Sequence, residues 1–230
     1  MEIYLVGGAV RDELLGISNN KSVNDYVVVG SSPQEMKSLG YRQVGKNFPV
    51  FIDPESSDEY ALARIESKVG AGYSGFEFDT SKTVTLEQDL YRRDLTINAI
   101  ARNVEGELID PYGGLEDIKT KTIRHVSDAF SEDPVRLLRV ARFASRFHKI
   151  GFSIAPETRK LMKQMVVSGE VDALVPERVF KELSLALCSD KPSIFFDVLL
   201  ESGAYHRLFP MLTSTGGHIS QLVDASVEYL

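Results

Sequence analysis

Short apolar runs separated by turn residues fill the first half of the chain, which is the pattern of β-strands rather than of long helices. We expect strands over residues 3–6, 26–29, 48–52, 59–64, 97–102 and 107–109, and helices at 9–16, 33–39 and 86–92. The helix at 33–39 has a clear start, because Ser31 and Ser32 can cap it and Pro33 suits its first turn. This half therefore predicts a small domain of mixed strands and helices.

From about residue 130 the apolar positions recur at helical spacing. The pattern predicts helices over residues 133–148, 156–168, 176–188, 192–202 and 218–228, several of them with proline in the first turn. Ser131 is the expected cap of the first of these helices. We therefore expect an α+β chain, with a mixed domain over residues 1–125 and an all-α domain over 126–230.

The composition favours a cytoplasmic protein. The chain has 230 residues, of which 43% are hydrophobic. No apolar run approaches the ~18 residues that a membrane span needs, and Met1 leads directly into a strand pattern instead of a signal peptide. The single cysteine, Cys188, fits a reducing compartment, and its apolar neighbours predict a buried thiol. The four histidines show no metal-ligand spacing.

Charge is distributed unevenly along the chain. The net charge is −7, but eleven Lys and Arg stand against four Asp and Glu between Lys119 and Lys163, a local balance of +7. A basic block beside an acidic half suits an enzyme that binds a polyanion and a metal ion. An ordinary solvated helical surface is the alternative, and charge alone does not decide between the two.

The segment Gly7-Gly8-Ala9-Val10-Arg11-Asp12 follows the first strand and opens a helix. Two glycines let backbone N–H groups approach an anion, and the start of a helix presents its positive end in the same direction. Arg11 lies one turn later, where a guanidinium can bind a triphosphate. The junction predicts a phosphate-binding turn, with a purely structural Gly-Gly turn as the alternative.

Two carboxylates are candidate metal ligands. Asp25 stands at the start of one expected strand, and Glu59 starts another that can neighbour it in a sheet. A nucleotide-transferring site is expected to hold two carboxylates separated by one residue, but Val23 occupies the partner position of Asp25. For Glu59 the alternative is a solvent-facing glutamate at a sheet edge.

The string Arg92-Arg93-Asp94-Leu95-Thr96-Ile97-Asn98-Ala99 places two arginines before an apolar run. The planar guanidinium suits phosphate because it donates two parallel hydrogen bonds. We expect Asp94 and Asn98 to brace the arginines and the turn.

A second arginine-rich string runs from Glu132-Asp133-Pro134 to Phe143. Helical spacing puts one acidic and four basic side chains on a single stripe: Asp133, Arg136, Arg139, Arg142 and Arg146. Four arginines without interleaved acidic residues favour a surface that binds a negatively charged or planar group. An aspartate and an arginine one turn apart can also read the edge of a nucleobase.

These segments, in this order, resemble the bacterial tRNA nucleotidyltransferases, the CCA-adding enzymes, of the class that also includes poly(A) polymerases. The resemblance runs from Met1 to about Pro210; its motifs are Tyr4 through Asp12, Arg92 through Ala99, Asp110-Pro111-Tyr112-Gly113-Gly114 and Glu132 through Phe143. It implies a polymerase-β-type nucleotidyltransferase head domain followed by an all-α neck and partial body. The implied reaction adds C, C and A to the 3′ end of tRNA from CTP and ATP and releases pyrophosphate.

Carried over by position, the resemblance also implies roles for individual residues. Asp25 and Glu59 would be the catalytic carboxylates of a Mg²⁺ site, and Asp133 and Arg136 would read the base. The implied nucleotide-binding residues are Gly8, Arg11, Arg93, Asp133, Arg136, Arg139 and Arg142. Expected partners are the acceptor arm of tRNA, CTP and ATP, and neither a membrane nor DNA.

The chain departs from the family pattern at two places. Family members carry Asp-x-Asp where this chain has Val23-Asn24-Asp25, and residues 14–24 contain no carboxylate. Family members also continue beyond the position of Leu230 into a longer body and tail. Two function classes therefore stay open: an enzyme with an incomplete metal site, and a nucleotide- or tRNA-binding homologue without turnover. Poly(A) polymerase is a third interpretation.

Overall fold

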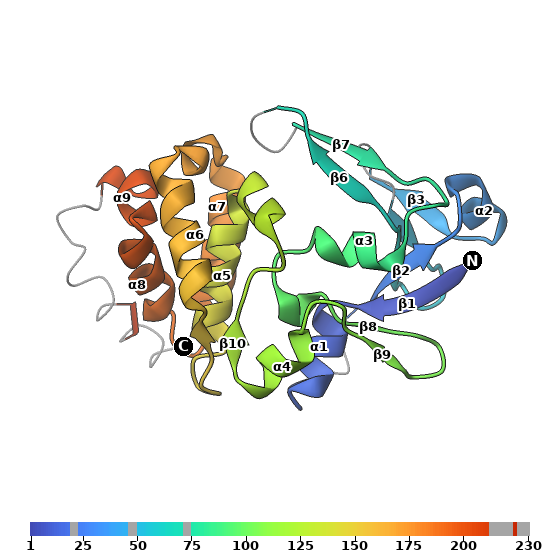
Figure 1. Ribbon diagram of the computed structural model, residues 1–230, viewed down its shortest axis with the longest axis horizontal. Coiled ribbons are helices and arrows are strands. Elements are labelled where there is room, and N and C mark those ends of the chain that lie inside the picture. Colours follow the sequence, from blue (N-terminus) through green and yellow to red (C-terminus); the bar gives the residue numbers. More distant parts are fainter. Residues whose placement is uncertain (19–22, 46–49, 71–74, 212–222, 225–230) are drawn as a thin grey trace. The chain divides into compact units, whose positions relative to one another are not determined.

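The computed structural model describes residues 1–18, 23–45, 50–70, 75–211 and 223–224 (Figure 1). The chain forms two compact units: Met1–Val69 with Phe76–Lys119, and Gly70–Gly75 with Thr120–Leu230. We call them the first and the second unit and describe each by itself.

A mixed sheet forms the centre of the first unit. Its described strands follow the order β3-β4-β5-β2-β1-β8-β9, and only β2 and β5 run parallel to each other. In that order the strands are β3 (Arg42–Val44), β4 (Val50–Ile52), β5 (Glu59–Leu62), β2 (Asp25–Val29), β1 (Glu2–Val6), β8 (Ala101–Arg102) and β9 (Leu108–Ile109). A separate hairpin joins β6 (Ile65–Lys68) to β7 (Phe76–Asp79).

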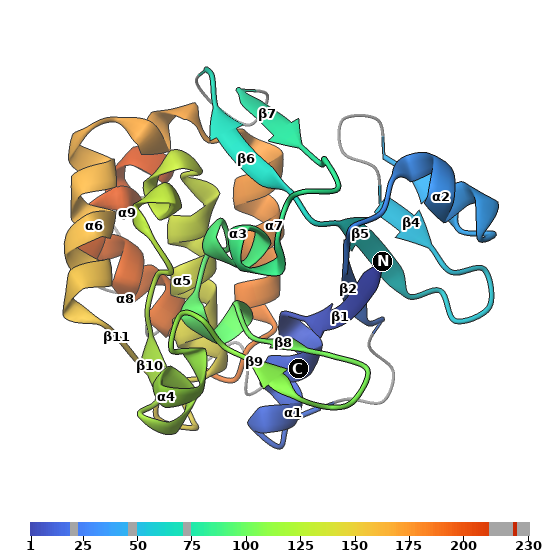
Figure 2. The ribbon, with the colours of Figure 1, turned by 45° about the vertical axis from the view of Figure 1, so that its right-hand side comes forward.

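Helix α2 (Pro33–Ser38) covers one face of this sheet (Figure 2). Its Met36 is fully buried against Val28, Phe51 and Leu62, which come from β2, β4 and β5. The expected cap is confirmed: the Ser32 hydroxyl accepts a hydrogen bond from the backbone N–H of Glu35, whose side chain accepts one in return from Ser32. The remaining helices are α1 (Gly8–Leu14), α3 (Leu86–Tyr91), α4 (Gly114–Lys119) and the 3₁₀ turn η1 (Thr96–Asn98).

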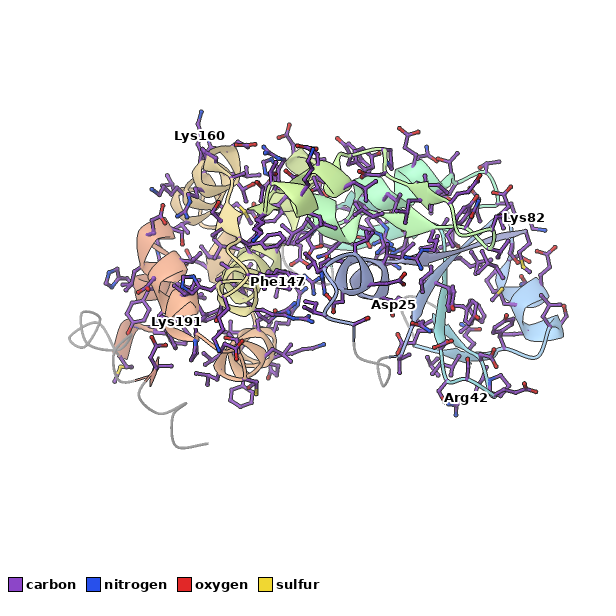
Figure 3. The ribbon with its side chains drawn as sticks, turned by 90° about the horizontal axis from the view of Figure 1, so that it is seen from below. Asp25, Arg42, Lys82, Phe147, Lys160 and Lys191 are labelled. Atoms are coloured by element: carbon purple, nitrogen blue, oxygen red, sulfur yellow. The ribbon has the colours of Figure 1, made fainter. Side chains whose placement is uncertain are left out.

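The second unit is built mainly of helices. In order they are η2 (Asp128–Glu132), α5 (Val135–Arg146), α6 (Pro156–Val167), η3 (Glu170–Ala173), α7 (Pro176–Leu187), α8 (Ser193–Ser202) and α9 (Ala204–Leu208), with a short parallel pair β10 (Thr122–Ile123) and β11 (Ser153–Ile154). Helix α5 packs against α7 and α8. Phe147 follows α5 and is fully buried inside this unit (Figure 3), where its ring stacks on Phe143 at 5.6 Å. Aromatic packing thus holds the end of α5 in place.

Most expected elements are confirmed within one to three residues, but the strand expected over 97–102 is wrong. Residues Thr96–Asn98 form η1, and the strand begins only at Ala101. Backbone packing explains the turn, because a Cβ on Gly114 would lie 2.2 Å from the Thr96 carbonyl oxygen. The close approach of α4 to this turn requires glycine.

Two other expectations are also wrong. Ser131 does not cap α5: its hydroxyl donates to the Asp128 carbonyl within η2, and Asp133 accepts from the backbone N–H of Val135 instead. Cys188 is exposed, because α7 ends at Leu187 with Ala186 as its last buried residue.

The helix expected over 218–228 lies outside the described residues except for 223 and 224. Among the helices that are described, none is long and apolar enough to cross a membrane.

Candidate nucleotide-binding site

Strand pairing brings three segments of the first unit to one end of the sheet. Because β1 and β2 are antiparallel, the end of β1 and the turn that follows it lie beside the start of β2, with Leu5 opposite Tyr26. Strand β8 also runs antiparallel to β1, with Val6 opposite Ala101, so η1 leads into the same end. The Gly7-Gly8 turn, Asp25 and the Arg92–Ala99 segment are therefore neighbours.

Asp25 and Glu59 are direct neighbours across the parallel strands β2 and β5. Paired positions project to the same face, so the two carboxylates share a face of the sheet, opposite the face that Val28 presents to α2. Desolvation by the surrounding protein raises the pKa of Asp25, the charge of Glu59 raises it further, and Arg93 acts in the opposite direction. Figure 3 marks Asp25. The predicted neighbourhood of the two carboxylates is confirmed.

The Gly7 turn has a backbone conformation that demands glycine. Gly7 has φ 70° and ψ −127°, and a Cβ on it would lie 3.3 Å from Nη1 of Arg93. A side chain at this position would therefore both strain the backbone and displace the guanidinium.

Arg11 is buried at 3% exposure. Its Nη1 donates to Oδ1 of Asn98 at 2.5 Å, and its Nε donates to Asp12 at 2.8 Å. Asn98 in turn donates to Asp94 at 3.0 Å, as expected of two residues that brace the turn. Arg11 therefore ties α1 to η1, and its expected contact with a nucleotide stays a prediction.

Arg93 is held by a carboxylate that sequence reasoning did not single out. Asp89 is fully buried and accepts hydrogen bonds from both Arg92 and Arg93. Burial by itself raises the pKa of Asp89, but the positive charges of Arg92, Arg93 and Arg64 outweigh it, so the pKa is lowered. The charged form is thus the stable one.

The second unit holds the other predicted nucleotide contacts. Asp133 precedes α5 and forms a bidentate ion pair with Arg178 of α7, at 2.9 and 2.8 Å. Arg136 is nearly buried, at 8% exposure, and its Nη1 donates to the Ala129 carbonyl oxygen at 2.8 Å. The structure therefore fixes the Asp133 carboxylate through α7 and the Arg136 guanidinium through η2. Their joint reading of a base stays a prediction.

The two further arginines of α5 differ in their surroundings. Arg142 donates to Glu182 of α7 at 2.6 Å and lies 4.2 Å from the centre of the Phe143 ring. Arg139 lies 5.6 Å from the centre of the same ring. Both distances are in the range of cation–π interactions, in which the ring attracts the guanidinium charge. Arg142 is thereby braced between α5 and α7.

The donor set for metal ions is small. In the described part of the chain no group of three or more His, Cys, Asp and Glu side chains is arranged to hold a metal ion. Val23 is 52% exposed and offers no oxygen, and the backbone N–H of Asn24 donates to Asp58 at 2.9 Å. Two carboxylates on one face, Asp25 and Glu59, could serve as ligands of one hard divalent cation that takes its other ligands from water. They do not fit a pair of such ions.

Asp89, Glu66, Arg178 and Glu182 are the residues that sequence reasoning missed. Asp89 stands four residues before Arg93, so helical spacing offers a local signal for that pair. The contacts of Asp133 with Arg178 and of Arg142 with Glu182 join residues 45 and 40 positions apart, and no local signal finds them.

Comparison with known proteins finds family models that match parts of both units of the chain. A family model described as the poly A polymerase head domain matches residues 3–124, and another, described as a probable RNA- and SrmB-binding site of polymerase A, matches residues 151–215. The Multifunctional CCA protein of Teredinibacter turnerae is 61% identical over 217 residues, which are 94% of this chain and 52% of that protein. The chain thus spans about half the length of the curated relatives it matches.

Solved structures agree with these relatives. A CCA-adding enzyme in complex with CTP matches 91% of this chain and 49% of its own, at 32% identity and a TM-score of 0.71. The Thermotoga maritima CCA-adding enzyme in complex with tRNA-CCA matches 91% of this chain and 48% of its own, at 30% identity and a TM-score of 0.72.

Proposed function

Since the chain belongs to the family of the poly A polymerase head domain, we propose that it is a tRNA nucleotidyltransferase that adds C, C and A to the 3′ end of tRNA from CTP and ATP. Its first unit has the α+β fold of the polymerase-β-type nucleotidyltransferases. One observation carries the proposal: the Gly7-Gly8 turn, the Asp25 and Glu59 carboxylates and the Arg93 segment meet at one end of the sheet. In the proposed division, the head covers residues 1–125 and the helical neck and partial body cover 126–230.

The head would bind the triphosphate. Gly8 offers its backbone to the phosphates, Arg93 donates its planar guanidinium to them, and Arg11 contributes positive charge from beneath the turn. A protein catalyses nucleotidyl transfer mainly by orienting the triphosphate and by stabilising the negative charge of the reacting phosphoryl group. The 3′-hydroxyl of the acceptor would approach from the side of Asp25.

Nucleotidyltransferases of this family use divalent metal ions. We propose Mg²⁺ as the ion and Asp25 and Glu59 as its protein ligands, with water in the vacant positions. When bound, such an ion neutralises phosphate charge and lowers the pKa of a coordinated hydroxyl. Because Val23 supplies no ligand, the chain is expected to hold the triphosphate better than it activates the acceptor.

The neck would select the base. Arg136 is proposed to donate to the acceptor atoms of the base and Asp133 to accept from the exocyclic amine that cytosine and adenine share, while Arg139 and Arg142 line the rest of the nucleotide. The bidentate contact of Arg178 supports this role of Asp133, because it holds the carboxylate in one orientation. The acceptor arm of tRNA is the proposed macromolecular partner, and the cytoplasm is the proposed compartment.

The experiment measures binding and product separately. Calorimetric titration of the chain with CTP, ATP, GTP and UTP should give binding of CTP and ATP only. Incubation of Val23→Asp with tRNA that lacks its CCA end should then give a product three nucleotides longer. A tail of adenosines would identify a poly(A) polymerase instead, and selective binding without any product in Val23→Asp would identify a silent homologue.

A further inference from the structure

We propose that Asp89 is a positioning residue for nucleotide binding, because its buried carboxylate holds Arg93 at the Gly7 turn. The inference rests on the proposed function, which makes Arg93 a triphosphate ligand. Asp89 itself is fully buried and out of reach of any ligand. It would act only through the guanidinium that it orients.

The hydrogen bonds of Arg93 divide its guanidinium into two sides. Nε and Nη2 donate to Oδ2 of Asp89 at 3.3 and 3.1 Å. Nη1 points the other way, to the Asn98 carbonyl oxygen at 3.5 Å, and lies 3.3 Å from the point where a Cβ on Gly7 would stand. A fork held on one edge by a carboxylate presents its remaining donors in a fixed direction. That direction is the turn at which the phosphates are proposed to bind.

The second oxygen of Asp89 is occupied by other partners. Oδ1 accepts from Nη2 and Nε of Arg92, at 2.6 and 3.1 Å, and from the backbone N–H of Arg64 at 3.2 Å. The two oxygens of Asp89 thus accept hydrogen bonds from two different arginine side chains, Oδ1 from Arg92 and Oδ2 from Arg93.

Glu66 completes the cluster. Its Oε1 accepts from Nη1 of Arg92 at 2.9 Å and from Nε of Arg64 at 2.8 Å. Glu66 therefore accepts hydrogen bonds from the Arg64 and Arg92 side chains, while Asp89 holds Arg93 from the side of α3. Without the Asp89 carboxylate, Arg93 would lose its anchor and would also face the charge of Arg92.

A purely structural role for Asp89 is the competing explanation, because the same carboxylate joins α3 to Arg64. The two roles differ in what they do to ligand selectivity. Loss of a structural anchor lowers the melting temperature and weakens all ligands alike. Loss of a positioned guanidinium weakens a triphosphate more than a monophosphate.

The test compares Asp89→Asn with a matched control, Asp117→Asn. Asp117 is also a buried carboxylate of the first unit, at 5% exposure, and it accepts from the Thr96 hydroxyl at 2.6 Å. The dissociation constants of CTP and CMP and the melting temperature are measured for the full chain and for each variant. Asp89→Asn should weaken CTP about tenfold, the worth of one hydrogen bond to a charged group, and CMP much less. Asp117→Asn should lower the melting temperature and leave the CTP-to-CMP ratio unchanged.

Arg93→Ala separates this inference from the proposed function. If Arg93→Ala leaves CTP affinity unchanged, both the nucleotide role of Arg93 and this inference are overturned. If Arg93→Ala weakens CTP but Asp89→Asn does not, the inference alone is overturned. In the double variant Arg93→Ala/Asp89→Asn, the second change should add nothing to the loss of CTP affinity. An additive loss would contradict action through Arg93.

Asp89→Glu is a second variant that tests the inference if Asp89→Asn does not fold. Asp89→Glu keeps the charge and moves the carboxylate by one methylene. It should weaken CTP more than CMP, though less than Arg93→Ala does. A CTP-to-CMP ratio equal to that of the unchanged chain would overturn the inference.

Discussion

Asp133 and Arg178 form a bidentate ion pair between the start of α5 and the first turn of α7, with N–O distances of 2.9 and 2.8 Å. Arg136, one turn further along α5, donates to the Ala129 carbonyl oxygen and is nearly buried. Both members of the proposed base-reading pair are therefore oriented before a nucleotide arrives. Such preorganisation reduces the conformational entropy that binding would otherwise cost.

Arg136→Ala should weaken CTP and ATP binding by roughly 1–3 kcal/mol, the worth of a bidentate base contact. Calorimetric titration measures the loss. Arg146→Ala is the matched control, because Arg146 is exposed at the last turn of the same helix and should change nucleotide affinity little. Equal affinities of Arg136→Ala and the unchanged chain would sink the base-reading role.

Gly7→Ala should destabilise the first unit by about 1–3 kcal/mol, because alanine is strained at φ 70° and ψ −127° and its Cβ would crowd Arg93. Thermal unfolding should show a melting temperature lower by several degrees. Gly8→Ala is the control: Gly8 lies in α1, and a Cβ there would meet Arg11 at an ordinary 3.6 Å. A similar loss of stability in both variants would argue against strain at Gly7.

Asp25→Asn should raise the melting temperature at pH 7. Desolvation and the neighbouring Glu59 raise the pKa of Asp25 above its unfolded value, so the folded state favours the protonated form. Ionisation of Asp25 therefore costs stability as the pH rises through the folded pKa, and the cost vanishes below the unfolded pKa of ~3.9. The gain from Asp25→Asn should accordingly shrink as the pH falls from 7 to 4. A gain that is independent of pH would contradict this origin.

Binding of tRNA should weaken steeply with salt if the basic segment Lys119–Lys163 contacts its backbone. The structure compensates part of that charge, since Arg142, Lys149 and Arg159 pair with Glu182, Asp190 and Glu201. Lys160 points outward from α6 (Figure 3), and Lys160→Gln should lower the salt slope by about one.

Filter binding at several salt concentrations measures that slope. Lys82→Gln is the control, because Lys82 belongs to the first unit and pairs with Glu35 at 2.5 Å. It should leave the slope unchanged. Affinity that barely changes between low and moderate salt would count against a tRNA partner for this segment.

Local patterns of apolar and polar residues predicted most helices and strands and the neighbourhood of Asp25 and Glu59. They could do so because the start of a strand and its alternation of apolar and polar residues are encoded over a few positions. The strand expected at 97–102 failed because a buried 3₁₀ turn and a buried strand have the same apolar sequence; packing of Gly114 on Thr96 decides between them. The residues that orient the site could not be predicted in this way. Glu66 and Arg178 act across the tertiary fold, and their contacts follow from strand and helix packing that no short stretch of sequence encodes.

We propose that this chain carries the site of a CCA-adding nucleotidyltransferase in which Val23 replaces one metal ligand. The most direct test is the rate at which the unchanged chain and Val23→Asp incorporate labelled C and A into tRNA without its CCA end, at millimolar Mg²⁺. Loss of a carboxylate ligand should cost at least about 10- to 100-fold, so the unchanged chain should be slow or inactive and Val23→Asp faster by that order. Rapid addition by the unchanged chain, not improved by Val23→Asp, would show that Val23 does not weaken the metal site.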